Sequence, residues 1–349
     1  MAIRIASIES FRVLAIFAVV LWHAPFVSSL SELVDGYFPV VLTGYLVWWI
    51  GPPYFFIAAG YFFGKSILTY GNPIAQLRRH VSPLIWIFIG WMCIYIIFPP
   101  GWPGEVYHHG WWQSFYSTVL KNMHLLATQN ISLFLKGDYP VFHLWFLPAL
   151  MFSFAVLTLV AICRVQRYLV LLVVSLYALA LTEEIMGGPL INNIHFGTWS
   201  IATLLTAIGW LLVGRKQPSV AMAWSVIVGG YALALIEGTI MNTVVHSSRE
   251  AIKWHFFLGG IILGLGIFLL ALAKPKLGES TPFPFLAQFT LGVYVSHILV
   301  MYTLNPIIWR LHVPLRGALV GIVVYALSIL LTIGLARVPV VRYLVVRPA

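Results

Sequence analysis

Charged residues are scarce in this chain. They make up 9% of its 349 residues, only 10 residues are Asp or Glu, and 61% are hydrophobic. A soluble domain is about 45–50% apolar and about 25% charged, so this composition indicates a polytopic membrane protein. Cysteine is also scarce, because only Cys93 and Cys163 occur, both in or beside apolar stretches. This excludes a disulfide framework and argues against a cysteine-based metal cluster.

Ten apolar stretches have the length of a membrane span, and an even number places both chain ends on one side. If the N-terminus is cytoplasmic, fourteen of the 20 Lys and Arg residues fall in the segments on that side, as the positive-inside rule requires. We therefore expect a single all-α bundle over residues 1–349 with N-in and C-in topology, no fused extracytoplasmic domain and no nucleic-acid partner. The stretches lie near residues 12–30, 41–63, 81–99, 142–162, 167–183, 198–214, 219–238, 254–273, 284–304 and 317–337.

Two local features interrupt this pattern. The run Gly51-Pro52-Pro53 lies inside the second stretch, and we expect it to kink or break that helix, as in transporters whose broken helices line a cavity. The longest connection, about residues 100–140, is aromatic, and we expect it to be a loop capping the outer face of the bundle.

Arg12 and His23 lie eleven residues apart in the first stretch. At about 100° and ~1.5 Å per residue, they share one helix face and lie roughly 16 Å apart. An ionisable group inside a membrane is a candidate functional residue by default. The imidazole reference pKa of about 6.5 suits a base that accepts a hydroxyl proton near neutral pH. The alternative is a buried histidine that hydrogen-bonds between helices.

Four ordered segments carry a family resemblance. The stretch from Glu9 to His23, with ten residues between Arg12 and His23, resembles the opening of the acyltransferase-3 family of integral membrane O-acyltransferases. Ala59 stands where that family usually has Ser, Val13 where Gly commonly follows the Arg, and Ser82 where another Arg is frequent. The other three similar segments are Phe55-Phe56-Ile57-Ala58-Ala59-Gly60-Tyr61, Phe142-His143-Leu144-Trp145-Phe146-Leu147 and Thr290-Leu291-Gly292-Val293-Tyr294-Val295-Ser296-His297.

The resemblance implies that His23 is the catalytic histidine and that Arg12 is essential. Arg12 offers a planar donor fork that would hold a coenzyme A phosphate. It would otherwise pair with Glu9, one turn earlier, or serve only as a membrane anchor. Lys65, Arg78 and Arg79 would form a basic cytoplasmic rim for the coenzyme phosphates, although positive-inside bias alone also predicts basic residues there.

Two further histidines, His143 and His297, fall by this topology near the depth of His23, and we expect a polar chamber in which both support catalysis. They would otherwise be unrelated interface histidines. No HExxH or CxxC pairing accompanies them, so we expect no metal. Tyr294 and Glu237 would hold sugar hydroxyls or be structural.

The resemblance implies a multi-pass enzyme of the bacterial inner membrane that moves an acyl group, most often acetyl, from cytoplasmic acyl-coenzyme A to a hydroxyl. The acceptor would be a cell-envelope glycan or a lipid-linked sugar. Any second transfer step would need a separate envelope-glycan assembly protein. The alternatives are a saccharide transporter or exporter of related fold and a purely structural membrane subunit.

Overall fold

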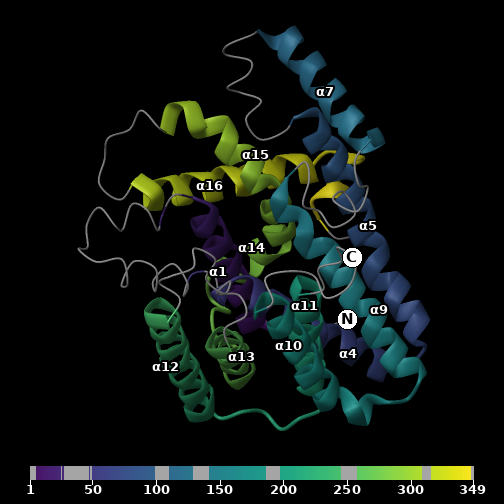
Figure 1. Ribbon diagram of the computed structural model, residues 1–349, viewed down its shortest axis with the longest axis vertical. Helices are drawn as coiled ribbons and strands as arrows, with labels where there is room; N and C mark the ends of the chain where they lie inside the picture. The colour runs from purple at the N-terminus through teal and green to yellow at the C-terminus, as the bar shows by residue number, and fades with distance from the viewer. Residues whose placement is uncertain are drawn as a thin grey trace. The chain divides into compact units, whose positions relative to one another are not determined.

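The structure is a computed structural model that describes residues 5–24, 26, 47, 49–98, 110–128, 141–185, 197–244, 258–308 and 316–346. Within these ranges, all regular secondary structure is helical, as the composition predicts (Figure 1). The α-helices are α1 Ala6–His23, α4 Pro52–Tyr70, α5 Pro73–Ile97, α7 Trp111–Thr128, α9 Phe146–Ile162, α10 Leu169–Ile185, α11 Gly197–Leu211, α12 Val220–Val244, α13 Leu258–Ala273, α14 Phe283–Leu286, α15 Thr290–Ile308 and α16 Arg316–Ala336. The 3-10 helices are η1 Phe142–Trp145, η2 Gln166–Tyr168, η4 Ala287–Phe289 and η5 Val341–Leu344.

Seven helical segments of the described ranges are long and apolar enough to cross a membrane. Each overlaps one of the ten predicted stretches, and α4, α11 and α13 overlap the remaining three. The last two are apolar but shorter than a usual span. The all-helical membrane fold is therefore confirmed, while the count of ten spans and the N-in, C-in orientation stay predictions. The seven are Ala6–His23, Pro73–Ile97, Phe142–Ile162, Gln166–Glu183, Val220–Ile240, Phe283–Leu304 and Gly317–Ala336.

The interruption predicted in the second stretch is confirmed. Gly51 is a bend, and α4 begins at Pro52 with a proline in its first turn. The first turn of a helix leaves its N–H groups without helical partners, so proline loses nothing there. The expected loop at about 100–140 is wrong in part, because α7 occupies its centre. This helix is too polar for a span, so a search for span-length apolar runs passes over it.

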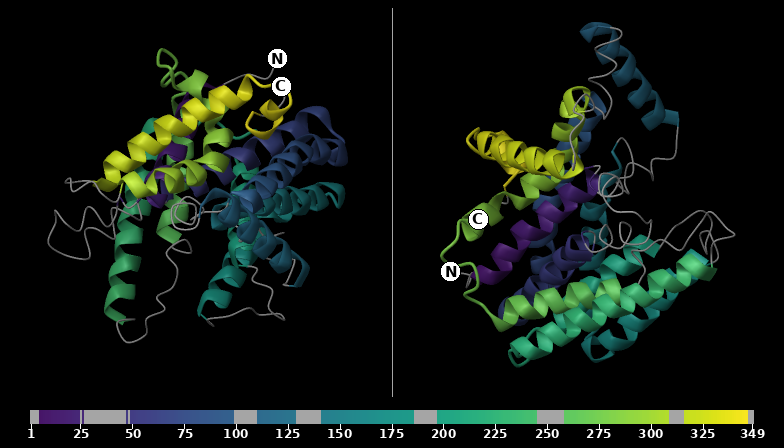
Figure 2. Two further views of the ribbon diagram at one scale, coloured as in Figure 1. Left: turned by 90° about the horizontal axis from the view of Figure 1, so that it is seen from above. Right: turned by 90° about the vertical axis from the view of Figure 1, so that its left-hand side faces the viewer.

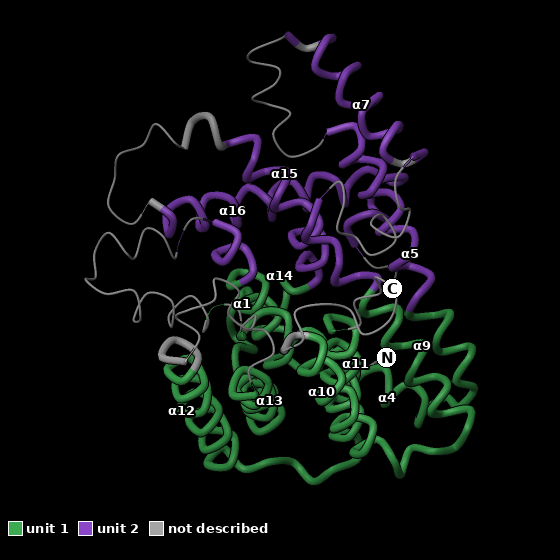
Figure 3. The backbone as a smooth tube through the Cα atoms, viewed as in Figure 1, with its two compact units in different colours: residues 1–18, 37–80, 149–287 green, residues 19–36, 81–148, 288–349 purple. Residues whose placement is uncertain are grey.

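The chain forms two compact units, coloured separately in Figure 3. Unit 1 contains residues 1–18, 37–80 and 149–287. In it, α12 packs against α13, and α4 packs against α11 and α13. Glycine makes the closest of these approaches: a Cβ on Gly60 would collide with the backbone of Thr206, and one on Gly209 with the backbone of Ile57. Small residues are what allow two membrane helices to meet backbone to backbone.

Unit 2 contains residues 19–36, 81–148 and 288–349. In it, α15 packs along α16, as the two further views in Figure 2 show, and η1 contacts α15. Gly292 on α15 gives room to Thr332 on α16. The indole N–H of Trp91 on α5 donates to the carbonyl of Leu344 (2.9 Å) and so holds η5 against that helix. The end of α1, η1 and α15 therefore belong to one unit.

Candidate active site

Three of the predicted site residues converge in unit 2. The ring centroid of His297 lies 5.2 Å from that of His23 and 5.0 Å from that of His143, and the His23 and His143 centroids are 6.5 Å apart. The rings come from α1, η1 and α15, which are separated by more than a hundred residues along the chain. The structure therefore brings these three sequence-predicted histidines together, while their roles stay predictions.

Two tyrosines hold the elements that carry this cluster. The Tyr294 hydroxyl donates to the backbone carbonyl of His143 and so ties η1 to α15. The Tyr95 hydroxyl donates to the carbonyl of Val295 (2.8 Å) and accepts from the N–H of Leu299 (3.3 Å), which ties α5 to the same helix. The hydroxyl of Tyr294 is thus used within the protein, and this contact favours its structural role over sugar binding.

The three histidines differ in how far they are exposed. His143 and His297 are 1% and 0% exposed, whereas His23, at the last position of α1, is partly exposed. Both ring nitrogens of His143 and Nε2 of His297 are buried without a well-formed hydrogen bond to a described group, whereas His297 Nδ1 bonds to a backbone carbonyl. Since buried polar groups are normally satisfied, these nitrogens mark the cluster as the candidate site. In the described ranges, no three His, Cys, Asp or Glu side chains are placed to share a metal ion.

The predicted pair of Arg12 and Glu9 lies at the other end of α1, in unit 1. Arg12 donates to the carboxylate of Glu9 at 3.0 Å, one turn apart, and the Arg12 side chain remains 31% exposed. The start of the helix is fixed by two contacts. Ser7 Oγ donates to the carbonyl of Ala271 (2.5 Å), and the buried Tyr54 hydroxyl donates to the carbonyl of Ile8 (2.9 Å). Glu9 therefore acts as the partner that orients the Arg12 guanidinium.

Sequence reasoning missed two cations that lie close to the start of α1. Lys274 and Lys276 flank Pro275, whose carbonyl accepts the backbone N–H of Ser7 at 3.1 Å. Both lysine side chains are exposed. In the same segment Gly278 has φ +82°, and a Cβ there would collide with Ser10 Oγ, so glycine is needed for this segment to pack on α1. The positive-inside count included these two lysines, but the sequence pattern did not predict that their segment contacts the start of α1.

The predicted basic rim spans a tight turn between α4 and α5. Gly71 (φ +62°) and Asn72 (φ +39°) reverse the chain, and Asn72 Oδ1 accepts the N–H of Ala75 (3.1 Å) to begin α5. Lys65 is half-buried near the end of α4, while Arg78 and Arg79 are exposed in the second turn of α5. Arg79 lies over the ring of Tyr70 at 5.7 Å. The turn thus places the three cations at one end of a helix pair.

Glu237 has a structural partner in unit 1. Its carboxylate accepts the backbone N–H groups of Leu258 (3.1 Å) and Gly259 (2.9 Å), the first two residues of α13. A carboxylate is favourable at a helix N-terminus because the first N–H groups have no helical partner and carry partial positive charge. These bonds favour the structural alternative for Glu237 over sugar binding.

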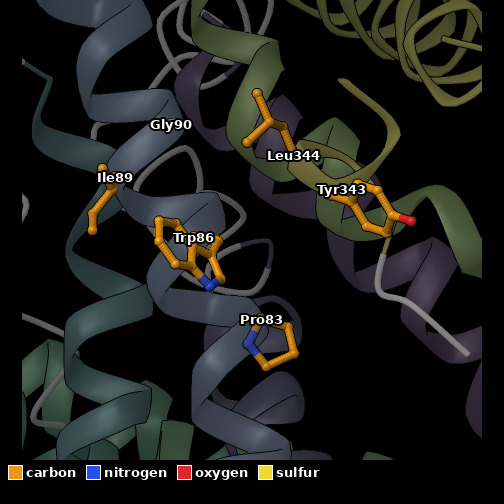
Figure 4. Close-up of a pocket in the computed structure, with 6 residues that line it drawn as sticks. All are labelled: Pro83, Trp86, Ile89, Gly90, Tyr343 and Leu344. Carbon is orange, nitrogen blue, oxygen red and sulfur yellow. The ribbon is translucent and has the colours of Figure 1, made fainter. Parts of the chain in front are cut away.

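An apolar groove of about 400 Å³ lies elsewhere in unit 2, between α5 and η5 (Figure 4). Its lining offers only the Trp86 indole and the Tyr343 hydroxyl as side-chain polar groups, and it contains none of the predicted site residues. The groove is therefore suited to an apolar chain and not to a charged group such as a phosphate. The lining residues are Pro83, Trp86, Ile89, Gly90, Tyr343 and Leu344.

Comparison with known proteins identifies the family. Residues 5–337, almost the whole chain, match the acyltransferase-3 family, described as an acyltransferase domain. Comparison with curated proteins and with solved structures gives no match. The match includes all four resembling segments and the three clustered histidines. The chain therefore belongs to the acyltransferase-3 family and is a multi-pass membrane acyltransferase.

Proposed function

We propose that this protein is an O-acyltransferase of the bacterial inner membrane that moves an acetyl group from cytoplasmic acetyl-coenzyme A to a hydroxyl of a cell-envelope glycan or lipid-linked sugar. The observation that carries the proposal is the convergence of His23, His143 and His297. Acyl transfer to an alcohol needs a group that accepts the hydroxyl proton, and a neutral imidazole is the side chain best suited to that step near neutral pH.

His23 is the ring that the substrates meet in this proposal, because it is the partly exposed member of the cluster. Two roles fit this position. His23 either takes the proton of the acceptor hydroxyl or carries the acyl group between donor and acceptor. In both cases the buried rings of His143 and His297 surround the reacting groups and keep bulk water from the thioester.

The donor would be held by the cations of unit 1. Arg12, oriented by Glu9, and the neighbouring Lys274 and Lys276 provide charge-assisted donors of the kind that bind pyrophosphate and phosphate groups. Lys65, Arg78 and Arg79 add cations at the turn between α4 and α5. These residues fit the phosphates of coenzyme A. α1 carries both Arg12 and His23, and eleven helical residues cover about 16 Å, which a pantetheine arm can span.

The N-in, C-in orientation is part of this proposal and rests on the distribution of basic residues. In that orientation, Arg12 and the α4–α5 turn face the cytoplasm, where acyl-coenzyme A is found, and the glycan approaches His23 from the other side. Any second transfer step would need a separate envelope-glycan assembly protein as partner.

The test uses purified protein in proteoliposomes with radiolabelled acetyl-coenzyme A and a lipid-linked saccharide extract of bacterial envelopes. The proposal predicts that label appears in the saccharide fraction and that free coenzyme A is released in equal amount. Absence of label in saccharide would contradict it. Saccharide flux across the liposome membrane that does not depend on acetyl-coenzyme A would favour a transporter, the alternative with which the break before Pro52 is compatible.

A further inference from the structure

The backbone fixes the protonation pattern of His297. Its Nδ1 lies 2.7 Å from the carbonyl oxygen of Tyr294 and 3.2 Å from that of Val293, both in the preceding turn of α15. A carbonyl oxygen only accepts hydrogen bonds, so Nδ1 must carry the hydrogen. In a neutral imidazole the other nitrogen, Nε2, then has the free lone pair. His297 is thus held as a proton acceptor.

The acceptor nitrogen of His297 is unused within the described part of the chain. Nε2 is fully buried and has no hydrogen-bond partner there. The hydroxyls that share its neighbourhood behave differently, because those of Tyr95 and Tyr294 both bond to backbone groups. A buried lone pair without a donor is costly, and such a group in a native protein requires an explanation.

The ring of His297 lies beside the ring of His23, which meets the substrates in the proposed function. The His23 centroid is 5.2 Å away, at a tilt of 33° between the ring planes, and the His143 centroid is 5.0 Å away. A hydroxyl group that reaches His23, the partly exposed residue of the cluster, would therefore also lie close to the ring of His297. For His143, no well-formed bond to a described group assigns the hydrogen to one of the two nitrogens.

We infer that His297 is a catalytic residue whose Nε2 takes the proton of the acceptor hydroxyl, an inference that rests on the proposed acyl transfer. The acceptor oxygen bonds to the thioester carbonyl carbon as its proton moves to Nε2. The carbon–sulfur bond then breaks, and the coenzyme A thiolate takes the proton from the His297 imidazolium. The products are an ester and free coenzyme A, with no change of oxidation state. In this direct transfer His23 orients the acyl group. If His23 carries the acyl group first, the coenzyme A thiolate leaves with the His23 proton. The acceptor oxygen then displaces the His23 nitrogen, which takes a proton from the His297 imidazolium.

The test compares His297→Asn with His297→Gln in the acetyl-coenzyme A assay described above. The amide N–H of Asn occupies the place of Nδ1–H, so this variant keeps the bond to the Tyr294 carbonyl but has no basic nitrogen. A proton acceptor in the reaction contributes about 10²–10⁴-fold, so kcat should fall at least about a hundredfold in both variants. The KM for acetyl-coenzyme A should stay within about threefold of wild type, because the donor phosphates bind elsewhere.

The outcomes separate this inference from the proposed function. If wild type transfers label and His297→Asn retains more than about a tenth of wild-type kcat, then His297 acts only through its backbone bond and the inference is wrong, while the proposed function stands. If wild type transfers no label, the proposed function fails first. Should His297→Asn not fold, as judged by gel filtration, His297→Ala is assayed with added imidazole. If added imidazole restores kcat, the variant lacks a base and the inference is supported. If it does not, the inference that His297 is the proton acceptor is wrong.

Discussion

Replacing Tyr95 by Phe removes one buried hydroxyl beside the histidine cluster. That hydroxyl donates to the Val295 carbonyl at 2.8 Å and accepts from the Leu299 N–H at 3.3 Å, and the side chain is 0% exposed. A hydrogen bond contributes about 0.5–1.5 kcal/mol net, and a buried group left without its partner costs about 1–3 kcal/mol. We expect the free energy of unfolding in detergent to fall by about 1–3 kcal/mol.

The same substitution should also slow the reaction. The Tyr95 ring lies 5.5 Å from the ring of His143, and its hydroxyl anchors α15 two residues before His297. A displacement of about 1 Å in a reacting group can cost roughly a hundredfold in rate. We therefore expect kcat for acetyl transfer to fall about 10- to 100-fold in Tyr95→Phe, with little change in the KM for acetyl-coenzyme A.

The matched control is Thr158→Val, which also exchanges one buried hydroxyl for an apolar group. Thr158 Oγ1 donates to the Phe154 carbonyl (2.7 Å) and belongs to unit 1, whereas the cluster residues belong to unit 2. This variant should lose about 0.5–1.5 kcal/mol of stability and retain wild-type kcat. Equal kcat values for the two variants, measured on equal amounts of folded protein, would refute the assignment of Tyr95 as a positioning residue.

Three further substitutions test other parts of the structure. Gly60→Ala places a methyl group against the Thr206 backbone and should lower the unfolding temperature markedly. The control Gly229→Ala, which has no described atom within 4 Å of the added Cβ, should not lower it, and equal unfolding temperatures would count against the α4–α11 contact. Glu237→Gln should cost about 0.5–2 kcal/mol of stability without changing the KM for the saccharide, and a raised saccharide KM would instead assign Glu237 to the acceptor site. Arg12→Ala should raise the dissociation constant of coenzyme A, measured by calorimetry, by about tenfold or more, and an unchanged value would show that Arg12 is only an anchor.

Much of the fold follows from the sequence because a bilayer allows few structures. Long apolar runs in lipid must be helical, since only a helix satisfies its own backbone. The break at Gly51 also follows, because glycine and proline are the residues that end helices. By contrast, α7 does not follow, because a partly polar helix needs tertiary contacts that the pattern of span lengths does not record.

The candidate site was predictable in its members but not in its arrangement. His23, His143 and His297 stand out because ionisable residues are rare within apolar stretches. Their rings come within 5.0–6.5 Å of one another, and the hydroxyls of Tyr294 and Tyr95 tie η1 and α5 to α15 beside them. A tyrosine in an apolar helix is an ordinary core residue until its hydroxyl partner is known. The only available signal was the rule that a buried hydroxyl requires an acceptor.

In unit 1 too, the sequence predicts local pairs but not contacts between distant segments. The pairing of Arg12 with Glu9 follows from helical spacing, because residues three apart share a face. The position of Lys274 and Lys276 beside the start of α1 does not, since it results from a backbone bond between segments more than 260 residues apart. Long-range contacts of this kind are not encoded in local spacing.

The most direct test of the central claim is acetyl transfer by His23→Ala beside His124→Ala, which alters an exposed histidine of α7. A base or nucleophile in the reaction is worth about 10²–10⁴-fold, so His23→Ala should lose at least about a hundredfold in kcat while it still purifies as folded membrane protein, and His124→Ala should match wild type. If both variants transferred acetyl from acetyl-coenzyme A at the wild-type rate, His23 would have no part in the reaction.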